Sequence, residues 1–202
     1  MLLWVTSYAS SWGMVFHTEN LMVLQVLVLA LTPAADAYAL GGSTAAGDGS
    51  DGRYGWPIRL MCALTVLVYF IAGVAKLRVS GLDWVTGEIL QNYISYDALR
   101  KAELGSIHSP LGPFLAAHGV IFKPLAAFSL LMELGAPLAL FGRRIALVWV
   151  ISAVLFHLGV LAVMAIMFPY VCFGFGFACF FRVERAADWL ARRFRREKMA
   201  AA

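Results

Sequence analysis

Long apolar stretches dominate the pattern of this chain, and three of them are long enough to form membrane-spanning helices. Residues 58–77 and 121–142 each contain about twenty residues, and residues 145–181 run for 37 positions without Asp, Glu, Lys or Arg. About 20 apolar residues cross the hydrocarbon core of a bilayer as a helix. Because 37 residues exceed one crossing and Pro169 interrupts them, we predict a span over 145–168 and a short return over 170–181.

Weaker patterns flank these stretches. The apolar segment 17–40 contains Pro33 and predicts an additional span, and residues 41–55 hold six glycines, which is typical of a flexible aqueous loop. Residues 82–105 mix aromatic and aliphatic side chains with charges, which favours amphipathic helices at the membrane interface. Residues 183–202 combine apolar residues at helical spacing with many basic ones, which predicts an interfacial basic helix or, alternatively, an ordinary solvated charge run.

These patterns predict an all-α integral membrane protein. We expect a membrane domain over 1–182, with a bundle of four to five transmembrane helices plus interfacial amphipathic helices, and a basic tail over 183–202. The composition agrees, because 61% of the residues are hydrophobic and only 14% are charged, whereas a soluble domain carries roughly 25% charge. The partner that this composition indicates is the lipid bilayer.

The basic residues are distributed unevenly. The net charge is +4, and seven of the sixteen Lys and Arg residues lie between Arg182 and Lys198. This clustering indicates a membrane surface rather than a nucleic acid as the partner. The positive-inside rule then places the tail and the Gly142-Arg143-Arg144 turn in the cytoplasm. We therefore expect a plasma-membrane protein whose N-terminus lies outside.

The N-terminal region lacks the features of a secretory signal. No Lys or Arg precedes Arg53, so the positively charged region that begins a signal peptide is missing. An outside N-terminus without a signal normally needs an earlier span, so we expect an upstream segment in the native chain. Cys62, Cys172 and Cys179 lie in apolar runs without metal-ligand spacing, and we interpret them as packing residues with no metal site.

Lys76 is the first candidate for chemistry. Helical spacing places Tyr69, Gly73 and Lys76 on one face, where the glycine lets a neighbouring helix or ligand approach the lysine stem. Loss of solvation in a low-dielectric site favours a neutral amine, which can act as a base. The alternative is a lysine that ends the span and extends to the outer headgroups.

His157 and Glu133 are polar residues inside predicted spans. Counted at roughly 1.5 Å per residue from the Gly142-Arg143-Arg144 turn, His157 lies about 18 Å deep and Glu133 about 13 Å. We predict that they hydrogen-bond across adjacent antiparallel helices, with Lys76 closer to the outer face. A structural link between helices and a proton-handling role both remain open.

Two other residues have two interpretations each. His17 opens the segment 17–40, just before its apolar residues begin at Leu21, and is either a boundary residue or a ligand contact. Trp84 is either an interfacial anchor or part of a ligand roof.

Four segments, taken together, resemble a known family. YFIAGVAKL followed by DWVTGEIL is similar to the HTTM domain, the membrane portion of vitamin K-dependent gamma-carboxylases and their bacterial relatives. The remaining segments occur in family order over residues 12 to 182, namely FHTENLMVLQVLVLALTPAADAYAL, MELGAPLALFGRR and LFHLGVLAVMAIMFPYVCF.

The resemblance implies roles for several residues. Lys76 occupies the position of the lysine taken as the base that deprotonates vitamin K hydroquinone, and His17 and His157 match histidines near the quinone. Where the carboxylases have two adjacent lysines, this chain has Ala75-Lys76. With Lys76 and His157 as the catalytic pair, the resemblance implies a quinone pocket, for which the candidate contacts are His17, Tyr69, Gly73, Trp84 and Glu133.

The functional hypothesis follows from this resemblance. The large soluble region that completes the carboxylases has no counterpart here, so we expect a carboxylase-like or oxidoreductase-like protein with a quinone or lipid pocket rather than a glutamate carboxylase. The alternative is a non-catalytic membrane subunit, such as a DoxX-like or maturation factor, which binds a membrane or extracytoplasmic protein partner. A transporter is disfavoured because the chain shows no internal repeat.

Overall fold

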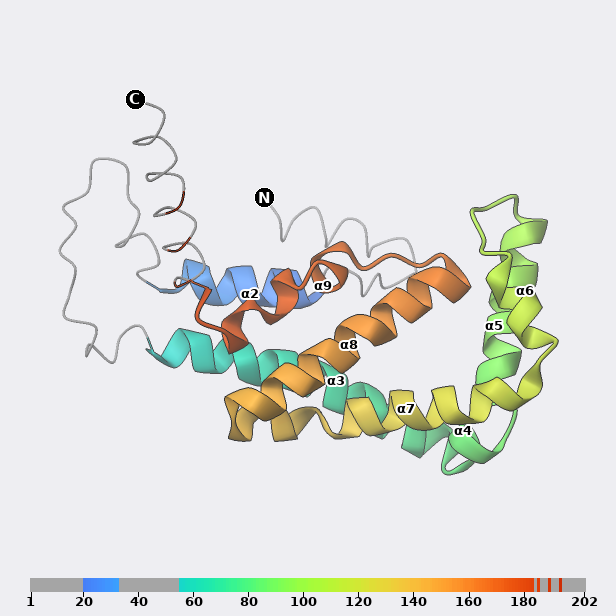
Figure 1. The fold of residues 1–202 in the computed structure, drawn as a ribbon, viewed down its shortest axis with the longest axis horizontal. Coiled ribbons are helices and arrows are strands. Elements are labelled where there is room, and N and C mark those ends of the chain that lie inside the picture. The colour runs from blue at the N-terminus through green and yellow to red at the C-terminus, as the bar shows by residue number, and fades with distance from the viewer. Residues whose placement is uncertain (1–19, 33–54, 184, 186–188, 190–192, 194–202) are drawn as a thin grey trace.

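The computed structural model describes residues 20–32, 55–183, 185, 189 and 193 (Figure 1). Within these residues the chain forms helices and no strand, so the predicted all-α class is confirmed for the described part of the protein. His17, most of the glycine-rich loop and most of the basic tail lie outside the described residues. The elements, in chain order, are α2 (Asn20–Ala30), α3 (Gly55–Ser80), α4 (Asp83–Thr86), α5 (Ile89–Glu103), α6 (Leu111–Ala116), η2 (Gly119–Ile121), α7 (Phe122–Leu134), η3 (Ala136–Phe141), α8 (Arg143–Met164), α9 (Pro169–Cys172) and η4 (Phe175–Phe180).

Two of the described helices, α3 and α8, are long and apolar enough to cross a membrane. They contain 26 and 22 residues, which at 1.5 Å per residue exceeds the ~30 Å hydrocarbon core. Large apolar side chains on both helices are exposed, including Ile71 at 55% and Val148 at 66%. A surface of this kind suits lipid contact, because contiguous apolar patches are rare on soluble proteins.

The predicted span 121–142 forms a broken helix. Helix α7 ends at Leu134, and a 3₁₀ segment, η3, begins after Gly135. Pro137, at the start of η3, has no N–H to continue the α-helical ladder. The indole Nε1 of Trp149 donates to the Met132 carbonyl oxygen at 3.0 Å, which links α8 to the end of α7. The apolar pattern of this region is therefore realised in two short helices rather than one long one.

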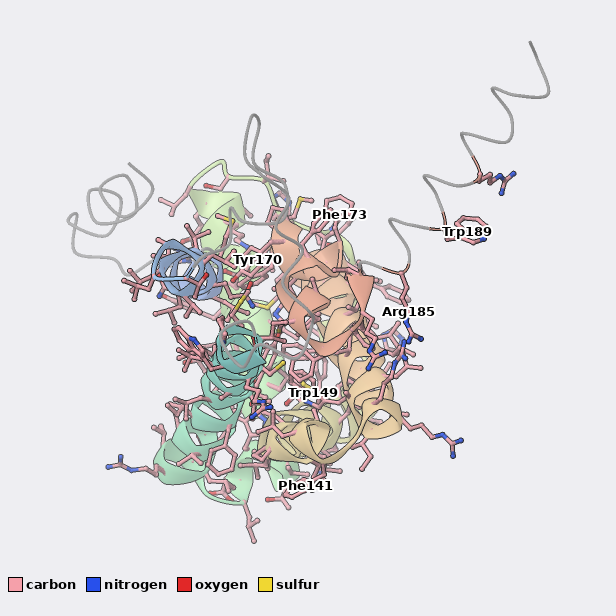
Figure 2. The ribbon with its side chains drawn as sticks, turned by 90° about the vertical axis from the view of Figure 1, so that its left-hand side faces the viewer. Phe141, Trp149, Tyr170, Phe173, Arg185 and Trp189 are labelled. Carbon is pink, nitrogen blue, oxygen red and sulfur yellow. The ribbon has the colours of Figure 1, made fainter. Side chains whose placement is uncertain are left out.

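The core lies where α3, α7, α8 and the return through η4 meet. Trp149 stands inside this group in Figure 2, which looks along the bundle, while Phe141 and Phe173 lie on the outside. The Trp149 ring packs edge-on against Tyr69 at 5.1 Å and against Phe177 at 5.6 Å, measured between centroids. Edge-to-face pairs at this spacing are favourable, so these rings hold three segments of the chain together.

Helices α5 and α6 lie crosswise at the end of α8 (Figure 1). The last carbonyl groups of a helix have no partner within it, and here other segments supply donors. Lys101 Nζ donates to the Met164 carbonyl oxygen and Ser109 Oγ to that of Ala162, both at 2.5 Å. Helix α8 stops at Met164, before the predicted 168, because Ala165 is left-handed with φ 52°.

Helix α2 is anchored to the bundle by one buried amide. Gln25 Nε2 donates to Thr65 Oγ1 at 3.2 Å and to the Gly176 carbonyl oxygen at 2.9 Å. A buried amide is costly unless it is hydrogen-bonded, so these two bonds fix α2 against α3 and η4.

Candidate functional site

Gly73 brings α3 and α7 into close contact. A Cβ atom at this position would lie 3.0 Å from Glu133 Cβ and 3.0 Å from Leu134 Cδ2. A side chain at Gly73 would therefore push the two helices apart, as expected where small residues mediate helix packing in membranes. The predicted role of this glycine as a point of close approach agrees with the geometry, and the neighbour is a helix.

Lys76 meets Glu133 one turn beyond this contact. The Lys76 Nζ donates to Glu133 Oε1 at 2.6 Å, and the two side chains are 20% and 6% exposed. An ammonium and a carboxylate removed from water each lose solvation, and only a well-formed pair offsets that loss. The structure therefore places Lys76 in an interhelical ion pair, and its ammonium does not extend away from the bundle.

Aromatic rings cover the ammonium group. The Nζ atom lies 4.8 Å from the Trp84 ring centroid and 5.7 Å from that of Phe156, within the distance at which ring faces attract cations. Trp84 belongs to the four-residue helix α4 and donates from Nε1 to Ser129 Oγ at 3.3 Å. A short helix at the end of α3 thus places an indole over the ion pair.

A cavity of about 290 Å³ adjoins Lys76, just below the roughly 300–1,000 Å³ typical of small-molecule sites. It lies between α3, α4, α5, α7 and α8. The lining includes Lys76, Trp84, Tyr93, Phe128, Ser129 and Phe156. An apolar cavity with a few convergent polar groups is the usual form of a ligand site.

Glu133 has one oxygen without a partner. Its Oε2 atom is buried and lacks a hydrogen bond among the described residues. Buried carboxylate oxygens are costly when unpaired, so such an atom invites a donor from water or a ligand. One carboxylate oxygen of Glu133 therefore bonds Lys76, and the other lacks a hydrogen-bond donor among the described residues.

His157 belongs to a neighbouring aromatic cluster, which adjoins the Lys76 site through the Phe156 ring, 5.2 Å from that of His157. Its Nδ1 lies 2.8 Å from the Ala153 carbonyl oxygen, and its ring packs against Tyr69 at 5.8 Å and Phe168 at 4.9 Å. A carbonyl only accepts, so Nδ1 donates the hydrogen bond, and Nε2 is an acceptor whenever the ring is neutral. His157 and Tyr69 are not among the residues that line the cavity beside Lys76.

The predicted hydrogen bond between Glu133 and His157 is wrong. Glu133 Oε1 bonds Lys76, Oε2 has no described partner, and His157 bonds its own helix. The depth count placed the two residues at comparable levels, but it carries no information on helix rotation. Glu133 turns toward α3, where Gly73 leaves room for it.

Sequence reasoning identified Lys76, Glu133 and Trp84, and it missed the other residues of this site. Ser129 precedes Glu133 by one helical turn, a spacing that places both on the same face of α7. Phe156 and Tyr93 carry no local signal, because aromatic residues are common throughout these helices.

The fold and the site define a class: a helical membrane-type protein in which two packed helices hold a buried Lys–Glu pair beside an apolar cavity. The chain belongs to the HTTM domain family, which it matches over residues 15–189. Neither a curated protein nor a solved structure matches it.

Proposed function

We propose that this protein binds an isoprenoid quinone or a similar amphipathic ring compound beside Lys76, and that Lys76 and Glu133 exchange a proton with it. The observation that carries the proposal is the ion pair of 2.6 Å at the wall of an apolar, aromatic cavity. Membership of the HTTM family supports it, because that family is related to the membrane domain of vitamin K-dependent gamma-carboxylases.

The residues present suit such a ligand. Trp84, Phe128 and Phe156 offer flat apolar surfaces, and Lys76 offers a polar end to the cavity. Glu133 is not part of the lining and would act through its ion pair with Lys76. A hydroquinone, when bound, would supply phenolic protons and two-electron redox chemistry. The match is one of shape and polarity, with aromatic walls around the ring and Lys76 at its oxygen.

The ion pair provides a route for a proton within the protein. Transfer from Lys76 Nζ to Glu133 Oε1 would convert two buried charges into a neutral amine and a neutral acid without changing the net charge. A low-dielectric site lowers the cost of the neutral pair relative to the charged one. The neutral amine would then serve as a general base, with Glu133 as its proton store. His157 would act from the neighbouring aromatic cluster, through Nε2.

The proposed topology places this site near the outer surface. Helices α3 and α8 would cross the membrane in the same direction, and α7 with η3 would return between them. Helix α2 would supply a further crossing, and α9 with η4 a short return. By the positive-inside rule, Arg143 and Arg144 would face the cytoplasm of a bacterial cell, so Lys76 would lie toward the opposite leaflet.

Mass spectrometry of lipids that copurify with the protein tests the ligand. Wild type should retain a quinone-class compound at about one per chain. Gly159→Leu tests the cavity directly, because Gly159 lines it and a Cβ there meets no atom within 4 Å. That variant should fold normally and lose the compound. Lys76→Ala should also lose the compound. Its matched control is Lys123→Ala, which removes an exposed lysine at the start of α7 and should leave the compound bound. Phospholipid alone in the wild-type preparation would refute the proposal.

A non-catalytic membrane subunit is the second candidate. The ion pair links α3 to α7 directly, as a purely structural contact would, and a membrane or extracytoplasmic protein partner would then carry the function. The double variant Lys76→Met with Glu133→Leu separates the two, because it removes both charges while keeping apolar volume. A structural role predicts a folded protein with unchanged ligand and partner binding. A proton-handling role predicts a folded protein without turnover.

A further inference from the structure

A second cavity lies at the end of the bundle away from Lys76. It measures about 480 Å³ and is formed by the start of α3, the junction between η3 and α8, and the residues that end and follow η4. Figure 1 places the starts of α3 and α8 at the same end of the molecule. The cavity is thus separated from the Lys76 site by most of the length of α3.

Three arginines from three different segments line this cavity: Arg59, Arg143 and Arg182. All three are exposed, and none has an ion-pair partner among the described residues. The described acidic residues lie in α4, α5 and α7 or at Glu88, and none of them lines this cavity. Like charges gathered at one opening repel each other and attract an anion.

Backbone donors add to the positive character of this opening. Helix α8 begins at Arg143 after Gly142, which supplies no side-chain cap. The first amide groups of a helix lack partners within it and point toward its N-terminal end, where anions bind readily. Gly142 and Arg143 both line the cavity, so these donors lie at the same opening as the guanidinium groups.

The rest of the lining is apolar. Ile58, Ala63, Leu140 and Phe180 form walls between the helices, and Cys62 Sγ lies 3.3 Å from the Cys179 carbonyl oxygen within them. A free phosphate would use only the arginine rim. A phospholipid would use both parts, with its phosphate at the rim and its chains along the apolar wall. Guanidinium groups suit phosphate oxygens because they donate two parallel hydrogen bonds.

We propose that this arginine pocket binds the headgroup of an anionic phospholipid from the leaflet at this end of the bundle, holding together the starts of α3 and α8. The proposal requires that the chain spans the membrane and is independent of any role of Lys76. Basic pockets between membrane helices bind anionic headgroups in this way. Arg185 is exposed, and its backbone N–H bonds the Arg182 carbonyl oxygen at 3.2 Å, so a further basic residue follows Arg182 closely in the chain.

The test compares adjacent arginines on one helix. Arg143 lines the cavity, whereas Arg144 is also exposed but is not part of the lining. Purified full-length protein in neutral detergent is titrated with phosphatidylglycerol or phosphatidylcholine, and native mass spectrometry counts bound lipid while thermal unfolding reports stabilisation. Wild type should bind one phosphatidylglycerol in preference to phosphatidylcholine. Arg143→Gln should weaken the affinity for phosphatidylglycerol by roughly tenfold or more, and Arg144→Gln should change this affinity less than about threefold.

Further measurements distinguish a bound phospholipid from free phosphate, and a pocket from a diffuse surface charge. Millimolar inorganic phosphate should neither stabilise the protein nor displace the lipid, and equal stabilisation by phosphate alone would overturn the lipid assignment. Equal losses of phosphatidylglycerol affinity in Arg143→Gln and Arg144→Gln would indicate binding to a diffuse surface charge and would contradict the pocket. Should Arg143→Gln fail to fold, Arg143→Lys keeps the charge without the paired donors and should give an intermediate loss. Unchanged affinity in that variant would also contradict the proposal.

Discussion

The two ends of the bundle use basic side chains in opposite ways. Near the end of α3, Lys76 is largely buried, paired with Glu133 and covered by Trp84. At the start of α3, Arg59 is exposed and lines a cavity together with Arg143 and Arg182, and none of the three has an acidic partner among the described residues. The comparison shows that burial decides the role of a charge here. A buried cation needs a fixed partner within the protein, whereas an exposed group of cations can take its partner from the membrane.

The largest expected effect is the loss of one member of the ion pair. Glu133→Ala leaves Lys76 buried without a counter-charge, and we expect a loss of about 3–5 kcal/mol in the free energy of unfolding. Denaturant unfolding in detergent measures it, with the exposed Glu103→Ala as control. The double variant Lys76→Met with Glu133→Leu should recover most of the loss. If the double variant is less stable than either single one, the pair contributes more than mutual charge compensation.

Gly73 should show the next largest effect. Gly73→Leu forces a side chain against Glu133 Cβ and Leu134, and overpacking of this kind costs about 1–3 kcal/mol. We also expect it to separate Lys76 from Glu133 and thereby to reduce ligand retention. Gly159→Ala is the helical control for stability alone, because Gly159 is exposed and its Cβ meets no neighbour. Equal stability of Gly73→Leu and wild type would mean that α3 and α7 do not depend on close contact at this point.

Trp84 should have a moderate effect. Trp84→Leu removes both the ring above Lys76 Nζ and the hydrogen bond to Ser129, at an expected cost of about 1–2 kcal/mol. Ser129→Ala leaves the ring in place and removes two hydrogen bonds, the one from Trp84 and the one that Ser129 Oγ donates to the Ala126 carbonyl oxygen at 2.9 Å. It should cost about 1 kcal/mol or less. Thermal unfolding of both variants separates the ring contact from the bonds of Ser129. A loss in Ser129→Ala as large as that in Trp84→Leu would leave no separate contribution of the ring.

The smallest effect is expected at the arginine end. In neutral detergent without added lipid, Arg59→Gln should change the free energy of unfolding by no more than about 0.5 kcal/mol, because exposed groups without partners contribute little. Unfolding measured with and without phosphatidylglycerol checks this expectation. A large loss without lipid would show that Arg59 has a protein partner, and the contrast between the two ends would then fail.

The helical class and the two long helices could be read from the chain, because about twenty apolar residues in a row have few other stable arrangements. Lys76, Glu133 and Trp84 were also recognisable, since charges in apolar runs and a tryptophan beside them are uncommon. The partner of Glu133 was not predictable. Spacing along a helix gives depth, while the choice between His157 and Lys76 depends on how α7 is rotated about its axis.

The sequence by itself therefore determined which segments are apolar helices, where the basic residues concentrate and which polar side chains must be buried, because these properties follow from local composition and helical period. Only the tertiary structure decided that Gly73 brings Glu133 to Lys76, that the apolar stretch 121–142 breaks at Gly135, and that Arg59, Arg143 and Arg182 line one cavity. The physical reason is that each of these features joins residues far apart in the chain, and their meeting depends on helix rotation and close packing, which no local pattern encodes.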